Sequence, residues 1–239
     1  MKKNILNVSL LTVCASLTIG LAVGTSAQTN SFNYKTQEAH ALEYPAPSPD
    51  EYFVFSNGTI TGYKGPLDIN VDIVIPHTIG GEPVTAIGSE AFKNELNVTS
   101  ITIPSSVISI GDEAFYNCSG LTSVGIPNSV TSIGASAFKK CSSLTSVTIP
   151  NSISSIEANS FYNCTSLTSI EIPNSVTSIG NSAFRGCSSL TSITIPNSVI
   201  SIGGDAFSFC SSLTSITIPN SVTEIENLAF WECRNLTSI

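Results

Sequence analysis

Apolar residues recur along this chain in fixed columns that are spaced 23 positions apart. Isoleucine occupies one column from Ile87 to Ile225, and proline occupies another from Pro104 to Pro219. A third column consists of Phe92, Phe115, Phe138, Phe161, Phe184, Phe207 and Phe230. A fixed period of this length is typical of a solenoid, in which each repeat forms one turn of a continuous coil and shares its core with its neighbours.

One repeat, residues 144–166 (LTSVTIPNSISSIEANSFYNCTS), shows which elements the pattern predicts. The alternation near its start predicts a β-strand, because successive side chains of a strand point to opposite faces. Val147 and Ile149 are therefore expected to point into the core, whereas Ser146 and Thr148 point outward. Equivalent strands of successive repeats should then form a parallel sheet.

The rest of the repeat brings the chain back to the start of the next one. Pro150 ends the strand because proline cannot donate to a β-ladder, and residues 151–152 make the corner. Residues 153–156 predict a second short strand, and residues 160–164 suit a helical turn with its Phe ring inside. We therefore predict a solenoid with parallel strands at a 23-residue period, short second strands and helical turns.

A β-hairpin is predicted in front of the repeats. Two short segments that alternate apolar and polar side chains flank Asn57-Gly58, which is a strong signal for a two-residue hairpin turn. We interpret residues 53–72 as an N-terminal hairpin cap and residues 73–239 as about seven repeats, the last one truncated. The first repeat is longer than the others, which places an insertion near residues 80–83.

The N-terminus has the pattern of a secretory signal peptide. Lys2 and Lys3 precede an apolar run, and the small residues 25–27 suit a cleavage site. We predict a signal peptide over residues 1–27 and a polar, proline-containing linker over residues 28–52. A membrane anchor is the alternative, because the run is nearly long enough to span a bilayer, but its Ser and Thr content favours cleavage. We thus expect an exported protein with no membrane insertion after cleavage.

The chain stops at Ile239, in the middle of a predicted strand. An open solenoid end exposes apolar core and unpaired strand edges. Two hypotheses follow: the sequence is part of a longer protein, or this end self-associates with another chain.

Composition limits the partners and the chemistry. The formal net charge is −8, whereas nucleic-acid binding needs clustered Lys and Arg, so we expect no nucleic-acid partner. His40 and His77 lie near no nucleophile motif, and the chain has no nucleotide-binding loop. We therefore predict no enzyme, no catalytic residues, no cofactor and no metal.

Six of the seven cysteines follow the 23-residue period, and the seventh, Cys14, lies in the predicted signal peptide. Their regular spacing predicts one small buried slot per repeat, filled by a free thiol, and it contains no C-x-x-C pair for zinc. Disulfides between adjacent repeats are the alternative, although parallel side chains do not direct their Cβ atoms at each other as a disulfide requires. The six cysteines are Cys118, Cys141, Cys164, Cys187, Cys210 and Cys233.

The repeats IPNSVTSIGASAFKKCSSLTSVT and IPNSVTSIGNSAFRGCSSLTSIT resemble BspA-type leucine-rich repeats. The segments NGTITGYKG and IPHTIGGEPVTAIGSEAF resemble the start of such domains, so that the resemblance covers about residues 53–239. It implies a secreted or surface-attached protein that adheres to host matrix proteins, host cells or other microbes, and it implies no shared catalytic residues. No wall-anchoring tail is visible in this sequence.

Two outward surfaces are the candidates for binding. The first is the outer side of the strands, a hydroxyl-rich array at Ser146, Thr148, Ser169, Glu171, Ser192, Thr194, Ser215 and Thr217. The second is the variable position after each column phenylalanine, which includes Tyr116, Tyr162, Arg185 and Trp231. Variation within near-identical repeats indicates exposure, and Tyr, Arg and Trp are favoured anchors in interfaces. The alternatives are a polar face that only keeps the solenoid soluble, neutral surface variation, and ice binding by the hydroxyl array.

The sequence therefore predicts a secreted or cell-surface leucine-rich-repeat binding module, adhesin-like, that recognises a host or microbial protein or glycan. The alternative is a structural repeat scaffold or spacer at the cell surface without a ligand of its own.

Overall fold

The computed structural model describes residues 46–66 and 70–238 of the chain. Residues 43–239 form one compact unit. The predicted signal peptide and most of the predicted linker, including Cys14 and His40, lie outside the described residues. The described end of the linker contains one short 3-10 helix, η1 (Asp50–Tyr52).

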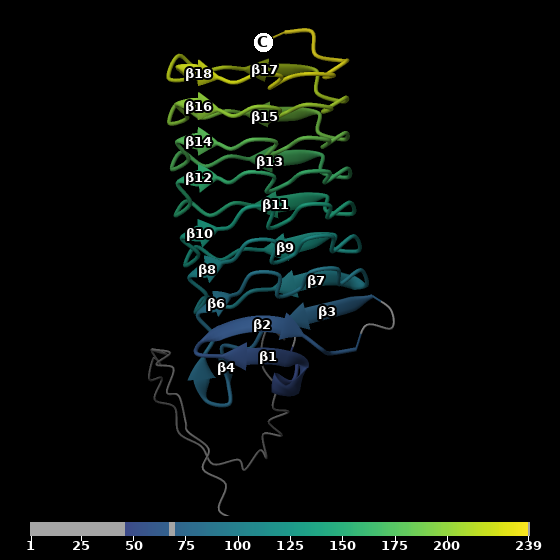
Figure 1. Ribbon diagram of the computed structural model, residues 1–239, viewed down its shortest axis with the longest axis vertical. Helices are drawn as coiled ribbons and strands as arrows, with labels where there is room; N and C mark the ends of the chain where they lie inside the picture. Colours follow the sequence, from purple (N-terminus) through teal and green to yellow (C-terminus); the bar gives the residue numbers. More distant parts are fainter. Residues whose placement is uncertain (1–45, 67–69, 239) are drawn as a thin grey trace, which may run out of the picture. The chain divides into compact units, whose positions relative to one another are not determined.

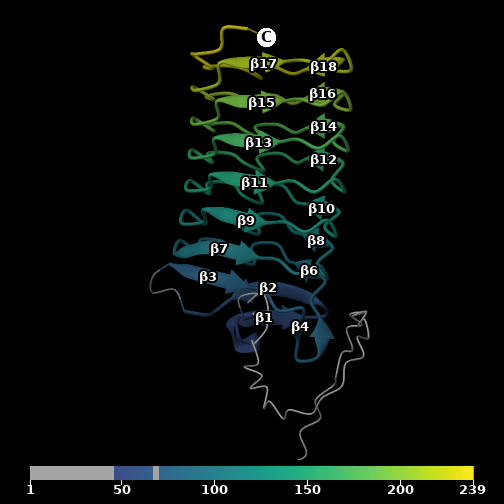
Figure 2. The ribbon, with the colours of Figure 1, turned by 180° about the vertical axis from the view of Figure 1, so that it is seen from behind.

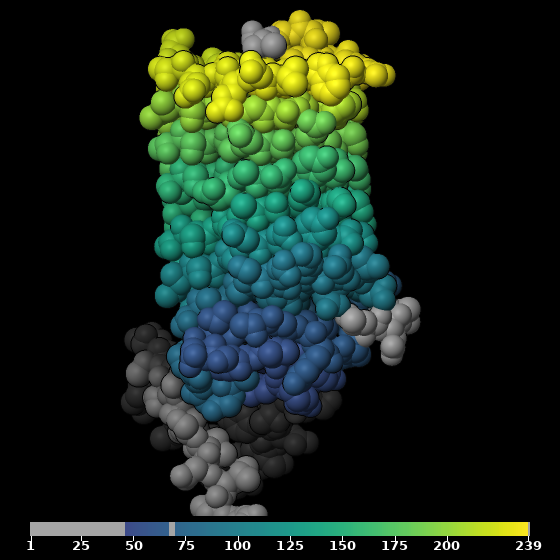
Figure 3. Space-filling model, viewed as in Figure 1, coloured from purple at the N-terminus to yellow at the C-terminus, as the bar shows by residue number. Residues whose placement is uncertain are grey.

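The repeats form a β-solenoid with two stacks of parallel strands (Figures 1 and 2). Each repeat contributes one strand to the first stack and one two-residue strand to the second stack, which confirms the predicted period and parallel pairing. Figure 3 shows the repeats as successive bands of colour. The first sheet contains β3 (Val71–Val74), β7 (Val98–Thr102), β9 (Ser123–Gly125), β11 (Ser146–Thr148), β13 (Ser169–Glu171), β15 (Ser192–Thr194) and β17 (Ser215–Thr217).

The second stack is divided between two sheets. β1 (Phe53–Ser56) and β2 (Thr59–Tyr63) lie in the first of these together with β6 (Ala86–Ile87), β8 (Ser109–Ile110) and β10 (Ser132–Ile133). The other contains β12 (Ser155–Ile156), β14 (Ser178–Ile179), β16 (Ser201–Ile202) and β18 (Glu224–Ile225).

The predicted N-terminal hairpin is confirmed. β1 and β2 pair antiparallel around Asn57 and Gly58, whose φ angles of 50° and 73° suit the tight turn. β2 then pairs in parallel with β6, so that the hairpin adds two strands to the N-terminal edge of the second stack. The extra residues of the first repeat form a separate small hairpin of β4 (Thr78–Ile79) and β5 (Glu82–Pro83).

A column of stacked phenylalanine rings runs through the core. Neighbouring ring centroids from Phe92 to Phe230 lie 5.2–5.6 Å apart, with interplanar angles of 2–15°. Tyr63 of the hairpin continues the column, 5.7 Å from Phe92. Because six of these seven phenylalanines are buried and Phe230 is partly buried, one elongated core passes through all the repeats.

The predicted helical turn is wrong in detail, because residues 157–164 form linked β-turns. Tyr162 N–H donates to Asn159 O (3.1 Å), but Phe161 N–H and Asn163 N–H donate to carbonyls of the next repeat, 2.8 and 2.7 Å away. The positive φ angles of Asn159 (58°) and Asn163 (56°) interrupt any helix. These bonds between repeats make this segment a third ladder of the solenoid.

The cysteine column consists of free thiols, in agreement with the predicted slot. The Cys164 thiol donates to Phe138 O (3.2 Å) in the preceding repeat, and the equivalent bond recurs for the other five cysteines at 2.9–3.2 Å. Burial raises the pKa of the thiol at Cys118 and at Cys187 to about 12. The slot thus holds a small side chain that also satisfies a buried carbonyl.

The second stack is interrupted between β10 and β12, which belong to separate sheets. Most repeats have glycine just after the second strand, and a Cβ atom added at Gly134 or Gly180 would lie 2.5–2.7 Å from a backbone nitrogen of the preceding repeat. Glu157 occupies this glycine position in the β12 repeat. The pairing is thus interrupted at a repeat in which this glycine is replaced by a residue with a side chain.

A side chain in this glycine column does not always break the ladder. Glu226 occupies the same column, yet its N–H still donates to Ile202 O (2.9 Å). The repeat before Glu226 has Gly204 where the repeat before Glu157 has Ala135. The interruption is therefore specific to the β10–β12 junction.

We expect Phe161→Ala to lower the free energy of unfolding by about 3–5 kcal/mol, because it leaves a cavity within the ring column. Urea unfolding followed by far-UV circular dichroism measures this change. Ile108→Ala is the control, since Ile108 is 52% exposed and its truncation should change stability by only about 0.5 kcal/mol. Equal effects of the two substitutions would contradict the stacked core.

We also expect the free energy of unfolding to fall as the pH rises above about 9. Unfolded thiols lose their protons near pH 8.5, whereas burial holds the pKa of the folded thiols well above that value. The stabilisation is complete below the unfolded pKa and is lost as the pH approaches the folded pKa. Urea unfolding at pH 7.5 and 10 tests this, and Cys164→Ala should show a shallower pH dependence. An unchanged slope in the variant would contradict this explanation.

Candidate functional site

The strand face is the outward side of the first sheet. Strands β11, β13, β15 and β17 each show an exposed–buried–exposed pattern, and their parallel register stacks equivalent residues at about 4.8 Å per repeat. All eight residues predicted for this face are exposed there. They form two columns: Ser146, Ser169, Ser192 and Ser215, and Thr148, Glu171, Thr194 and Thr217.

A neighbouring threonine column uses its hydroxyl groups within the stack. Thr145 donates to Thr122 O (3.2 Å) and Thr168 donates to Thr145 O (3.4 Å), and the pattern continues along the solenoid. The eight side chains of the two outer columns make no side-chain hydrogen bond with any part of the chain that the structure describes. Their hydroxyl and carboxylate groups are therefore free to bond a ligand.

A niche of about 570 Å³ lies where the strand face meets the proline corner. Glu171 and Thr194 line it from the strand face, and Asn151, Asn174 and Asn197 line it from the corner. A carboxylate beside amides and a hydroxyl offers both acceptors and donors to a polar ligand. The sequence prediction missed these asparagines because they were assigned only to the corner turn.

The strand face changes character at its N-terminal end. Asp72 of β3 accepts hydrogen bonds from the hydroxyls of Ser100 (2.6 Å) and Thr99 (2.7 Å), and these bonds lower the pKa of its carboxyl group. Asp72 was also missed by the sequence prediction, since β3 lies before the most regular repeats.

The turn ridge is the column of residues that follows the phenylalanines. Tyr116 has Lys93 Nζ at 5.3 Å and Lys140 Nζ at 5.4 Å from its ring centroid, and Lys139 Nζ lies 4.9 Å from the ring of Tyr162. Side chains from successive repeats thus alternate as cation and aromatic ring, at distances where a cation is attracted to the ring face.

The turn ridge is less exposed than the sequence predicted. Tyr116, Tyr162 and Arg185 are half-buried, and only Trp231, at 46%, is clearly exposed. Ser208, in the same column, is fully buried and donates to Leu228 O. The expectation of uniform exposure is therefore wrong, because neighbouring repeats cover this column.

Arg185 and Trp231 each have a specific neighbour on the ridge. Arg185 forms an ion pair with Asp205 and also lies 5.0 Å from the ring centroid of Phe209. Phe209 in turn packs edge-on against Trp231, with the ring centroids 4.8 Å apart. The C-terminal part of the ridge is therefore an aromatic pair next to a neutralised cation.

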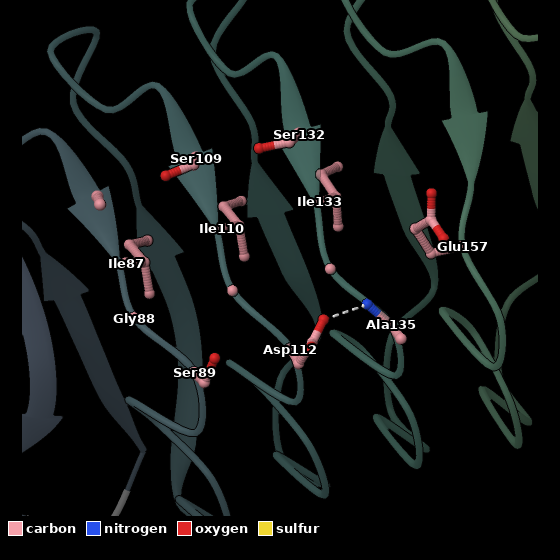
Figure 4. A pocket seen from close by; sticks show the side chains of 13 residues that line it. Ile87, Gly88, Ser89, Ser109, Ile110, Asp112, Ser132, Ile133, Ala135 and Glu157 are labelled. Carbon is pink, nitrogen blue, oxygen red and sulfur yellow. Dashed lines mark hydrogen bonds between the residues drawn. The ribbon is translucent and has the colours of Figure 1, made fainter.

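A shallow groove of about 510 Å³ crosses the second stack (Figure 4). Figure 4 shows Ile87, Ile110 and Ile133 stacked along it and Glu157 at the repeat where it ends. Asp112 at its border accepts a hydrogen bond from Ala135 N–H (2.8 Å), so this carboxylate supports the next repeat.

The described residues contain no cluster of three or more His, Cys, Asp and Glu side chains that could hold a metal ion. Nor does any helix within residues 46–66 and 70–238 have the length and apolar character needed to cross a bilayer. His77 lies at the first proline corner and lines a pocket of about 250 Å³ with Pro47, Pro76 and Pro104.

The stacked 23-residue repeats with their apolar strand positions define a leucine-rich-repeat solenoid. Six copies of the BspA type leucine rich repeat match the chain, over residues 85–195 and 154–239. The match covers more than half of the sequence, and the chain belongs to the BspA-type leucine-rich-repeat family. This repeat is typically non-catalytic, no enzyme family matches, and leucine-rich-repeat domains generally bind proteins.

Solved bacterial structures share this fold. A leucine-rich-repeat protein of T. pallidum is 31% identical, with a TM-score of 0.75 over 80% of this chain and 91% of that one. A leucine-rich-repeat protein of Bacteroides ovatus is 36% identical (TM-score 0.72; 78% and 50% covered), and a leucine rich cell surface protein of Faecalibacterium prausnitzii is 38% identical (TM-score 0.67; 82% and 55% covered). The chain spans about half the length of these last two. No curated protein matches it significantly in sequence.

We expect Gly125→Thr to raise the free energy of unfolding by about 0.5–1 kcal/mol. Gly125 interrupts the outer column of the strand face, and a Cβ atom there would meet nothing within 4 Å. A threonine reduces the freedom of the unfolded chain and suits a strand position. Urea unfolding measures the change, and a decrease in stability would show that this position does not have the open strand geometry described above.

Proposed function

We propose that this protein is a secreted or cell-surface binding module, adhesin-like, that recognises a protein or glycan of a host or of another microbe. The observation that carries this proposal is the strand face, whose exposed serine, threonine and glutamate side chains have no hydrogen-bond partner in the described chain. The family relationship supports it, because leucine-rich-repeat domains generally bind proteins.

The niche beside Glu171 is the part of this surface best suited to specific recognition. Outside the niche, a ligand lying across several repeats gains many weak hydrogen bonds of about 1 kcal/mol each or less. The niche adds a charged acceptor, and hydrogen bonds to charged groups are the stronger ones. We expect the hydroxyl columns to supply contact area and Glu171 to orient the ligand.

The proposed location outside the cell rests on the sequence and on one relative. The N-terminal segment has the pattern of a cleaved signal peptide. The Faecalibacterium prausnitzii protein, which is 38% identical, is described as a cell surface protein. Both support export of this chain.

Glu171→Lys should weaken adherence of the protein to any matrix protein or glycan that the wild type binds about tenfold, because the substitution reverses the charge in the niche and removes the acceptor. Adherence of the labelled protein to immobilised matrix proteins and to a glycan array is the measurement. Glu224→Lys makes the same charge change at an exposed position on the second stack, and it should leave adherence unchanged.

The alternative hypothesis, a structural scaffold without a ligand of its own, predicts no specific adherence in the same experiment. If the folded wild-type protein adheres no better than an unrelated acidic protein, the binding function is wrong and a structural repeat without its own ligand is favoured. Equal loss of adherence in both charge variants would instead point to net charge rather than to the strand face.

A further inference from the structure

All the cationic side chains of the described repeats lie on one side of the solenoid. Each follows a column phenylalanine by one to four positions, and Lys64, the other described cation, lies in the N-terminal hairpin region. Within the described repeats, the positive charge is thus gathered at the turn ridge and at the few positions that follow it. These residues are Lys93, Lys139, Lys140, Arg185 and Arg234.

Three of these cations are neutralised within the protein. Lys93 pairs with Glu90 (2.9 Å) and Glu113 (2.7 Å). Arg185 pairs with Asp205, and Arg234 pairs with Glu232 at 2.6 Å. Their charge is already matched, so they add little attraction for an external anion.

Lys139 and Lys140 have no carboxylate within 4 Å anywhere in the described chain. They contact aromatic rings instead: Lys139 lies 4.9 Å from the Tyr162 centroid and 6.0 Å from that of Tyr116, and Lys140 lies 5.4 Å from that of Tyr116. We name these four residues the ridge centre. Ring contacts position the two ammonium groups without cancelling their charge.

We propose that the ridge centre binds an anionic polysaccharide, whose carboxylate or sulfate groups pair with Lys139 and Lys140. The charge is complementary, and the acidic remainder of the molecule disfavours a polyanion elsewhere on the surface. This surface is separate from the strand face, and the inference therefore goes beyond the function proposed above.

The neighbouring aromatic side chains favour a glycan over an acidic peptide. Tyr116 and Tyr162 flank the lysines, and the exposed rings of Phe209 and Trp231 lie two and three repeats beyond Tyr162. Lysine ammonium groups lie over the rings of Tyr116 and Tyr162. The apolar surface offered to the C–H face of a sugar is therefore that of the exposed rings of Phe209 and Trp231. A linear polymer lying along the stack would meet a new repeat about every 4.8 Å, so that successive sugars contact successive repeats.

Binding of dextran sulfate and of polygalacturonate to the full chain tests this proposal, with neutral dextran and polyglutamate as the comparison polymers. We expect both anionic polysaccharides to bind and to release as salt is raised, because exposed charges are screened. Lys139→Gln/Lys140→Gln should weaken binding at least tenfold, and Tyr162→Leu should weaken it for the polysaccharides.

Lys64→Gln is the control, because it removes an exposed cation in the N-terminal hairpin region, outside the ridge centre, and should leave binding unchanged. Circular dichroism and urea unfolding confirm that each variant is folded. Glu171→Lys on the strand face should retain polysaccharide binding, which separates this site from the proposed adhesive face.

Three results would overturn the proposal: no binding of either anionic polysaccharide, equal loss in the Lys64 control, or polyglutamate binding as tightly as dextran sulfate. The last result would identify an acidic polypeptide as the ligand of the ridge centre. Loss of strand-face adherence with retained polysaccharide binding would leave the ridge centre intact and count only against the proposed function.

Discussion

Each repeat must bring its phenylalanine ring over the ring of the repeat before it, and the rest of the solenoid depends on that stacking. The 5.2–5.6 Å centroid spacing leaves room for one ring per repeat, so every repeat must return to the same place in its cross-section after 23 residues. Extra residues are tolerated only where they leave the coil, as the β4–β5 hairpin does. A single repeat has no neighbour to cover its ring, which is why such units occur in stacks.

The cysteine slot follows from the same constraint. Three residues after each ring the chain turns, and the carbonyl of the preceding repeat's phenylalanine needs a donor inside the core. A thiol is small enough for the space, donates to the carbonyl and stays protonated because burial raises its pKa. In the first repeat Glu95 takes this position and is only partly buried, and burial raises its pKa as well.

The positions that stabilise the repeat differ from those that we propose for recognition. The apolar columns and the three backbone ladders hold the stack together, and the outer columns vary without disturbing them. The strand face is a hydroxyl array that carries the carboxylates of Asp72 and Glu171, whereas the ridge centre is a pair of lysines between tyrosines. Two surfaces of such different chemistry allow one short repeat to present separate sites along the same molecule.

The sequence by itself determined the solenoid, its period, the parallel strands, the N-terminal hairpin and the outward direction of the strand-face residues. These features follow from the 23-residue periodicity and from the alternation of apolar and polar residues, both of which can be seen from each residue's position in its own repeat. The tertiary structure alone decided the β-turns at residues 157–164, the interruption at Glu157, the half-burial of Tyr116 and Arg185, and the lack of a carboxylate beside Lys139 and Lys140. Each of these features depends on a contact with a residue of another repeat, about 23 positions away. The distance and orientation between the two residues are set only when the repeats stack.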